Sequence, residues 1–236
     1  FELAGVNSLL SSVPEQVDAM YQDAVIESGK DSADAMVLAN LGAAWKQEQI
    51  KQQLIDSLGV AIGPKSLERL VIWQKGSLAS AIKAQDLRTE NVDFEQGFVM
   101  FAQQLPQSLP NQDKMELINQ LIDSKDMVNA MVDLTIAVSR PVLKAMVNTP
   151  SAQEEGLTES SIEQQLKELE QLLEPELAQQ MALLSYYLYK DIPLRELKAY
   201  VDFYQSDLGQ LELSILNKVL HQSIALWQKQ YQLNQS

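Results

Sequence analysis

The spacing of apolar residues is the feature that most constrains the fold of this chain. Almost every segment repeats its apolar residues every three or four positions, and alternating runs of β-branched residues are missing. Residues three and four apart share one face of an α-helix, whereas a half-buried strand requires a period of two. The pattern therefore predicts an all-α protein, built of antiparallel helical hairpins in an irregular bundle.

Proline, serine and glycine residues predict where these helices begin and end. Proline and serine suit the first turn of a helix, where backbone N–H groups lack partners, and glycine suits the position after the last turn. The helix opened by Ser32 is expected to run to Gly59, residues 148–159 to form a loop, and Pro141 to kink the helix that contains it. The expected helix starts lie at or near Pro14, Ser32, Pro64, Val92, Asp113, Lys125, Ser161, Pro175 and Pro193.

The length and composition allow one large domain or two small ones. The chain has 236 residues, of which 46% are apolar, and this is enough to bury a sizeable core. A Pro-Gln-Ser-Leu-Pro stretch at 106–110 is the best candidate boundary within the chain. We therefore expect an N-terminal helical unit at 1–105 and a C-terminal one at 113–236, packed either separately or as a single domain.

The two halves show a weak internal similarity when the sequence is aligned with itself. A first alignment places Leu67 on Leu197, Val71 on Val201, Trp73 on Phe203, and K-G-S-L-A-S at 75–80 on Q-S-D-L-G-Q at 205–210. A second alignment, in a different register, places Leu10 on Leu121 and Val17 on Val128. Two related helical units in tandem are one interpretation, and chance matching of helical apolar residues is the other.

Small residues recur at the same places in the two stretches of the first alignment. Gly76 and Ala79 in the first stretch correspond to Ser206 and Gly209 in the second. Positions three apart share a helix face, so each pair leaves a notch where another backbone can approach. Ser206 suits a helix N-cap, and the carboxylate of Asp207 suits the positive end of the helix that follows. We interpret Ser206 as part of a helix break between residues 205 and 208, not as a nucleophile.

Around this break the sequence resembles a known family. F-Y-Q-S-D-L-G at 203–209, preceded by P-L-R-E-L-K-A-Y-V, is similar to the hallmark E-L-x-x-x-x-x-F-Y-x-S-P-x-G of the bacterial family called domain of unknown function 2059. The residues that match are Glu196, Leu197, Phe203, Tyr204, Ser206 and Gly209, while Asp207 replaces the usual proline.

The resemblance covers roughly residues 113–225, including M-E-L-I-N-Q-L-I-D-S-K-D-M-V-N-A-M, which is similar to the opening helices of the family. It implies a small helical protein, exported to the periplasm in many bacteria, with no established activity and no catalytic residues to carry over. The chain begins at Phe1 instead of Met, which a removed signal peptide or a shortened start would explain.

Charge and residue usage argue against several classes of partner and site. The chain carries 18 basic and 32 acidic residues, for a net charge of −14, and its Lys and Arg residues are scattered singly. Nucleic acids and anionic bilayer surfaces are therefore poor partners. No apolar run is long enough to span a membrane. Because the chain has no cysteine, a disulfide, a thiolate zinc site and a cysteine nucleophile are all excluded.

The sequence offers no catalytic or metal-binding motif. His221 is the single histidine, so a Ser-His pair or a multi-histidine metal site cannot form within one chain, and we expect this histidine to be partly buried at the margin of an apolar face. The expected catalytic residues, metal ligands and cofactors are accordingly none. Clustered carboxylates leave a hydrolase or metal-dependent enzyme as an alternative; they belong to Glu163, Glu168, Glu170, Glu174 and Glu176.

Aromatic residues are concentrated near the C-terminus, where eight of the fifteen lie within residues 186–236. The run Y-Y-L-Y at 186–189 cannot face a single core, because successive helical positions turn by about 100°. The extra faces either meet neighbouring helices or line a cleft for an acyl chain or an apolar peptide segment. The residues predicted to line that cleft are Tyr186, Tyr187, Tyr200, Phe203 and Tyr204.

The leading functional hypothesis is thus a non-enzymatic, exported helical protein with a binding or envelope-maintenance role. Its predicted partner is an apolar small molecule or peptide segment. An oligomerising structural protein is a third alternative, beside the carboxylate enzyme.

Overall fold

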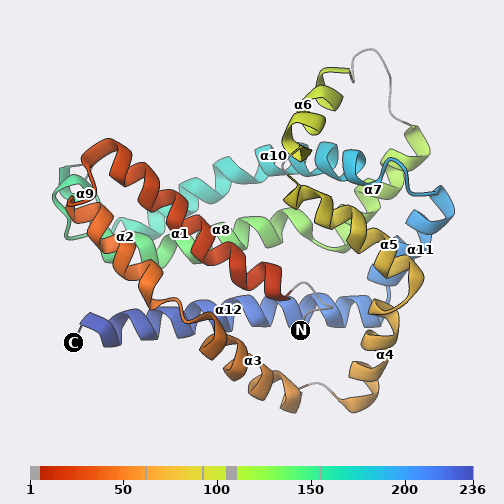
Figure 1. Ribbon diagram of the computed structural model, residues 1–236, viewed down its shortest axis with the longest axis horizontal. Coiled ribbons are helices and arrows are strands. Elements are labelled where there is room, and N and C mark those ends of the chain that lie inside the picture. Colours follow the sequence, from red (N-terminus) through yellow and green to blue (C-terminus); the bar gives the residue numbers. More distant parts are fainter. Residues whose placement is uncertain (1–5, 62, 92, 105–110, 155, 236) are drawn as a thin grey trace. The chain divides into compact units, whose positions relative to one another are not determined.

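The computed structural model describes residues 6–61, 63–91, 93–104, 111–154 and 156–235, and these residues fold into helices joined by short turns (Figure 1). The all-α prediction is confirmed, since the described part of the chain contains twelve α-helices, one 3-10 turn and no strand. The elements are α1 (Val6–Ser28), α2 (Ala33–Ala44), α3 (Gln47–Ala61), α4 (Pro64–Gln74), α5 (Ser77–Asp86), η1 (Leu87–Glu90), α6 (Phe94–Gln104), α7 (Gln112–Ser124), α8 (Met127–Met146), α9 (Pro150–Glu154), α10 (Ile162–Tyr189), α11 (Leu194–Tyr204) and α12 (Asp207–Gln235).

Most predicted helix starts agree with the structure to within two residues. α4 begins at Pro64, and the hydroxyl oxygen of Ser32 caps α2 by accepting a hydrogen bond from the backbone N–H of Ala35 at 3.2 Å. Pro193 occupies the N-cap position of α11. α8 continues through Pro141 as expected, while the size of the predicted kink stays a prediction.

Four local predictions are wrong. Pro14 and Pro175 lie inside α1 and α10 and do not start helices, and the predicted loop at 148–159 contains the short helix α9. Pro175 leaves the carbonyl of Gln171 without its helical donor, but both residues are exposed, so water can satisfy that carbonyl. The predicted helix from Ser32 to Gly59 breaks at Trp45, whose extended backbone turns its indole into the core.

The chain forms two compact units, each assembled from separate stretches of sequence. Unit 1 contains Phe1–Ile62, Val132–Leu172 and Ile215–Ser236, and unit 2 contains Gly63–Met131 and Leu173–Ser214. The predicted segments 1–105 and 113–236 each contribute residues to both units. The boundary predicted at 106–110 lies outside the described residues, so that division stays a prediction.

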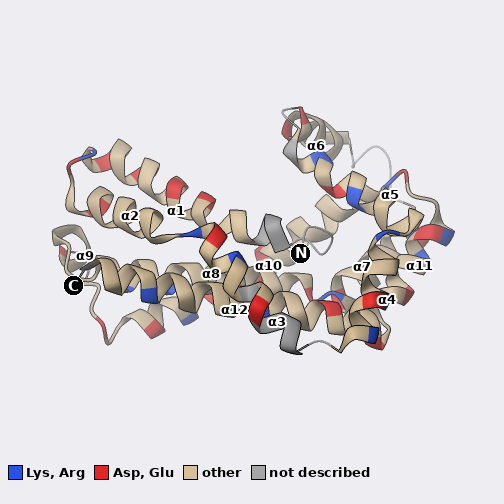
Figure 2. Ribbon diagram, turned by 60° about the horizontal axis from the view of Figure 1, so that its bottom comes forward, with Lys and Arg blue, Asp and Glu red and all other residues tan. Residues whose placement is uncertain are grey.

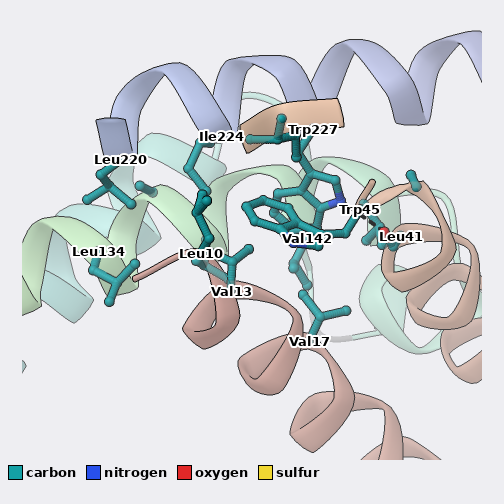
Figure 3. Packing of buried hydrophobic residues seen from close by; sticks show 14 of the residues in the cluster. Leu10, Val13, Val17, Leu41, Trp45, Leu134, Val142, Leu220, Ile224 and Trp227 are labelled. Carbon is teal, nitrogen blue, oxygen red and sulfur yellow. Dashed lines mark hydrogen bonds between the residues drawn. The ribbon is translucent and has the colours of Figure 1, made fainter. Parts of the chain in front are cut away.

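Unit 1 has an apolar core in which each helix contributes residues at helical spacing (Figure 3). The indole rings of Trp45 and Trp227 meet edge to face, with their centroids 5.8 Å apart. Trp227 is fully buried, and its indole N–H donates a hydrogen bond to the backbone oxygen of Leu41 at 2.9 Å. The core residues labelled in Figure 3 are Leu10, Val13, Val17, Leu41, Trp45, Leu134, Val142, Leu220, Ile224 and Trp227.

Unit 2 has a core that is richer in aromatic and polar groups. α7 buries Ile118, Leu121 and Ile122, and the facing helix α11 buries residues at the same three- and four-residue spacing. The buried residues of α11 are Leu197, Tyr200, Val201, Phe203 and Tyr204. The ammonium of Lys114 in α7 donates hydrogen bonds to the backbone oxygens of Lys190 and Ile192, the latter at 2.8 Å, and so satisfies carbonyls at the end of α10.

The predicted helix break is present between α11 and α12. The backbone N–H of Gly209 donates to the hydroxyl oxygen of Ser206 at 3.3 Å, and that hydroxyl donates to the carbonyl of Phe203. A Cβ atom at position 209 would lie 2.2 Å from the carbonyl oxygen of Phe203 and 2.7 Å from the Cα of Tyr204. The backbone that approaches the notch is therefore the end of α11, which turns directly onto the first turn of α12.

The first self-alignment, which pairs Trp73 with Phe203, holds for the helix boundaries as well as for the residues. α4 and α11 each contain 11 residues, and α5 and α12 begin at Ser77 and Asp207. The residues after α4 and α11, Lys75 and Gln205, have nearly equal backbone angles, with φ and ψ of −85° and −7° against −78° and −10°. The α4–α5 hairpin and the start of the α11–α12 hairpin thus have the same helix boundaries and turn geometry, while a true repeat stays a prediction.

The equivalent residues Trp73 and Phe203 stack on each other, with centroids 3.9 Å apart and an interplanar angle of 11°. Contact between equivalent residues is what a two-fold relation between the hairpins would produce. The second self-alignment, which pairs Leu10 with Leu121, has no such support, because it places the middle of the unbroken helix α1 on the junction of α7 and α8.

Figure 2 shows Lys and Arg residues spread over many helices, among a larger number of Asp and Glu residues. Of the helices in the described ranges, none is both long enough and apolar enough to cross a bilayer.

Candidate functional site

The five aromatic residues predicted to line a cleft fall into two separate groups within unit 2. Tyr200, Phe203 and Tyr204 belong to α11, whereas Tyr186 and Tyr187 belong to the end of α10 and contact α6. Four of the five are buried, with exposed fractions of 8% or less, and Tyr186 is half-buried. Their role in binding a ligand stays a prediction.

The first group is a set of stacked rings where α4 meets α11. Trp73 stacks on Phe203 and, at 6.5 Å, on Tyr200, while Tyr204 meets both Tyr200 and Phe203 edge to face with centroids 5.0 Å apart. These arrangements are the ones that aromatic quadrupoles favour. We call Trp73, Tyr200, Phe203 and Tyr204 the α11 ring cluster.

Beside the α11 ring cluster lies a set of polar side chains, Gln74, Asp86, Lys125, Tyr189 and Glu212, which we call the buried polar cluster. The hydroxyl of Tyr189 donates a hydrogen bond to Oδ1 of Asp86 at 2.7 Å, and the amide of Gln74 donates to Oε1 of Glu212. The ammonium of Lys125 lies 4.7 Å from the ring centroid of Tyr204 and 5.6 Å from that of Tyr200. Hydrogen bonds thus join α4 to α12 and α5 to α10 within unit 2, and Lys125 lies over two rings of α11.

Burial sets the protonation behaviour of this cluster. It raises the pKa of the Glu212 carboxyl from the ordinary 4.5 to about 7, although Lys125 and the hydrogen bond from Gln74 act in the opposite direction. Burial also raises the pKa of Asp86, against the hydrogen bond from Tyr189. It lowers the pKa of Lys125, which Asp86 and Glu212 partly restore. Glu212 is thus a carboxyl that exchanges its proton near neutral pH.

The second group is built around Tyr187. Residues 94, 97, 98 and 101 of α6 lie on one helix face, and the rings of Phe94, Phe98 and Phe101 surround the Tyr187 ring with centroid distances of 5.1 to 5.6 Å. Gly97 completes this face, because a Cβ there would lie 2.5 Å from the Tyr187 hydroxyl oxygen. The hydroxyl oxygen of the adjacent Tyr186 accepts a hydrogen bond from the backbone N–H of Asn111 at 2.9 Å.

The opposite side of α6 is exposed and carries two apolar side chains among polar ones. Val99 and Met100 have exposed fractions of 46% and 53%, and no residue of α6 whose side chain is described is buried. On the Tyr187 side, the Lys190 ammonium lies 4.5 Å from the ring centroid of Tyr187, and the Arg88 guanidinium carbon 5.7 Å from it. Tyr187 thus holds one side of a helix whose other side, with Val99 and Met100, faces solvent.

The remaining candidate residues lie elsewhere. His221 is exposed on α12, so the prediction of a partly buried histidine is wrong; one position past buried Leu220 is enough to turn it outward. It borders a depression of about 300 Å³ in unit 1, together with Asp133, Arg140 and Glu170.

Three carboxylates border a second open depression, of about 290 Å³, in unit 2. They belong to Asp123, Asp126 and Glu174. No group of three or more potential ligands in the described residues is arranged to hold a metal ion. The carboxylate-enzyme alternative stays a prediction.

Sequence reasoning missed the buried polar cluster, although one signal pointed to it. The first self-alignment pairs Glu212 with Ile82, which is fully buried, and Glu212 itself is only 3% exposed. A carboxylate at a position whose equivalent is a core isoleucine indicates a buried charge. Lys125 and Asp86 gave no such signal, because both lie at helix ends next to turns, and charged residues are mostly exposed.

Comparison with known proteins found no matching family model, no matching curated protein and no matching solved structure.

Proposed function

We propose that the protein is a non-enzymatic binding protein of the cell envelope, and that α6 is the element that binds an apolar peptide segment. The observation that carries this proposal is that α6, which is held on one side by Tyr187, exposes two neighbouring apolar side chains on its other side. One side is occupied by Tyr187, and the other leaves Val99 and Met100 in solvent. A contiguous exposed apolar patch on a protein surface commonly marks an interaction site, and Val99 and Met100 are adjacent.

A peptide fits this surface better than an acyl chain does. An acyl chain requires an enclosing cleft, whereas the outer side of α6 is a convex helix surface against which an amphipathic helix can lie. Met100 suits such a role, because its flexible thioether side chain adapts to different apolar partners. Phe94, Phe98 and Phe101 fix α6 against Tyr187 and so present Val99 and Met100 outward.

The test is a double substitution of Val99→Gln and Met100→Gln. A fluorescently labelled amphipathic peptide of leucine and serine serves as the probe, and its fluorescence anisotropy is titrated with protein. We expect the substitutions to weaken binding at least tenfold, since a buried methionine or valine contributes about 1.5 kcal/mol or more. The matched control is Leu67→Gln with Ile72→Gln, because these residues of α4 are similarly exposed, at 47% and 65%.

Loss of binding only in the α6 variant would support the proposal. Equal binding by the wild-type protein and the α6 variant, or equal loss in both variants, would contradict it. The proposed location in the cell envelope rests on the resemblance at residues 203–209, and fractionation of cells that produce the protein with its natural start tests it separately.

A further inference from the structure

In unit 2, a hydrogen bond joins the α4–α5 hairpin to the α11–α12 hairpin, and the aligned residues of the two hairpins could not form it. Gln74 is the last residue of α4, and its side-chain amide donates to Oε1 of Glu212 in α12. The equivalents of these two residues are Tyr204 and Ile82, which cannot form this bond. The link between Gln74 and Glu212 is therefore particular to this pair of positions, and it connects the α4–α5 hairpin to the α11–α12 hairpin.

The surroundings of Glu212 suit a neutral carboxyl group better than a charged one. The residue is only 3% exposed, and its second oxygen, Oε2, has no hydrogen-bond partner among the described residues. An ionised carboxylate needs several hydrogen bonds when it leaves water, and an unbonded buried oxygen is costly. At the equivalent position, the apolar side chain of Ile82 is fully buried.

The charged and titratable groups around Glu212 come from every neighbouring segment. Lys125, which follows α7, is the cation that acts on Glu212, and Tyr204 of α11 carries its ring beneath that ammonium. Asp86 of α5 also acts on Lys125, so the positive charge of this one ammonium is shared between two carboxylates. Tyr189 of the buried polar cluster and Tyr200 of the α11 ring cluster are neutral phenols, because burial raises the pKa of each.

We propose that Glu212 is a proton-operated latch between the two hairpins, closed when its carboxyl is protonated and loosened when it ionises. In the closed form the carboxyl accepts the hydrogen bond from Gln74 and buries no net charge. In the ionised form, Oε2 shares a negative charge and has no hydrogen-bond donor. A conformation in which water reaches Oε2 is then more favourable, and reaching it requires α4 and α12 to separate. The helix breaks at Gly76 and Ser206 lie within two and six residues of the latch, so each hairpin can bend there.

The direction of the pH effect follows from the two protonation states. A carboxyl with a folded-state pKa of about 7 and an ordinary value of 4.5 holds its proton more tightly in the closed form. The closed form is therefore most stable below about pH 4.5 and loses stability as the pH rises through 7. Between pH 5 and pH 8 we expect the opening equilibrium to shift by about 100-fold.

The experiment measures amide hydrogen exchange of residues 70–80 and 200–212 at pH 5 and pH 8, corrected for the intrinsic pH dependence of exchange. We expect protection in the wild-type protein to fall by about 100-fold, and in Glu212→Gln to change less than threefold. The matched control is Glu163→Gln, because Glu163 is exposed on α10 and should leave the wild-type behaviour intact.

A second measurement keeps the idea testable if Glu212→Gln fails to fold. The ¹³C resonance of the Glu212 carboxyl, followed by NMR in the wild-type protein, should titrate near pH 7. Titration below pH 5.5, or an equal loss of protection in wild type and Glu212→Gln, would overturn the proposal.

Discussion

The cores of the two units use opposite strategies to bury aromatic side chains. In unit 1 the Trp45 and Trp227 rings pack among aliphatic residues from α1, α2, α8 and α12. In unit 2 the α11 ring cluster packs beside a lysine, two carboxylates and a glutamine. An apolar core is stabilised by burial alone. A core with polar groups loses part of that stabilisation to desolvation and recovers it only if its hydrogen bonds are well formed. We therefore expect the stability of unit 1 to depend on the volume of its buried side chains, and the stability of unit 2 on individual polar contacts.

The largest expected effect tests the apolar core of unit 1. Trp227→Ala removes a fully buried indole and its hydrogen bond to Leu41, and should lower the free energy of unfolding by about 3–5 kcal/mol. Urea unfolding followed by far-UV circular dichroism measures the change. Trp73→Ala is the matched substitution in unit 2, where the indole is only half-buried, and it should cost clearly less. Equal losses in the two variants would remove the distinction between the cores.

The next effect concerns the turn from α11 into α12. Gly209→Ala places a methyl group against the backbone of Phe203 and Tyr204, which cannot move aside as a flexible side chain would. We expect a loss of about 2–3 kcal/mol in urea unfolding. Gly42→Ala in α2 is the control, since its Cβ would meet only Val17 at 3.9 Å. That variant should gain about 0.5–1 kcal/mol from helix propensity, and a loss there instead would contradict this account.

The smallest effect tests a single polar contact. Tyr189→Phe removes the hydroxyl that donates to Asp86 at 2.7 Å and should cost about 1–1.5 kcal/mol in the same assay. Without that donor the pKa of Asp86 should rise further, which NMR titration of its carboxyl would detect. Tyr187→Phe, two residues earlier in α10, is the control, because its hydroxyl bonds to no described residue. If the two variants are equally stable, polar contacts contribute less to unit 2 than we infer.

The helical content was predictable from the sequence because apolar spacing and N-cap residues act locally. Ser32, Pro64 and Ser206 mark helix starts through the free amides of one turn, and no distant contact is needed to recognise them. Trp45 shows where this reasoning fails. Its residue type and spacing are compatible with a continuing helix, but burial of its indole against Trp227, in a distant part of the sequence, breaks the helix there.

The candidate site was harder to predict, because its residues come together only through contacts between distant parts of the sequence. The tyrosines were noticed because their number is unusual. Tyr186 and Tyr187 pack against α6, whereas Tyr200 packs against α4, and this difference depends on tertiary contacts that the sequence does not reveal. Lys125 and Asp86 acquire their significance only when α5, α7 and α12 come together. The close approach of the Tyr187 hydroxyl to Gly97, where a Cβ would lie 2.5 Å from it, likewise appears only in the folded structure.

The stacking of Trp73 on Phe203 has a consequence for how the buried charge could arise. In a dimer of identical hairpins, any residue near the two-fold axis occurs twice, so a carboxylate placed there faces its own copy, and like charges repel. Covalent connection of the two hairpins in one chain removes this restriction, because each copy can change independently. One ring is accordingly an indole and the other a phenyl, and one of two equivalent core positions holds an isoleucine while the other holds an acid. This departure from symmetry places a carboxyl, that of Glu212, in the core of unit 2 where the other hairpin has only an apolar side chain.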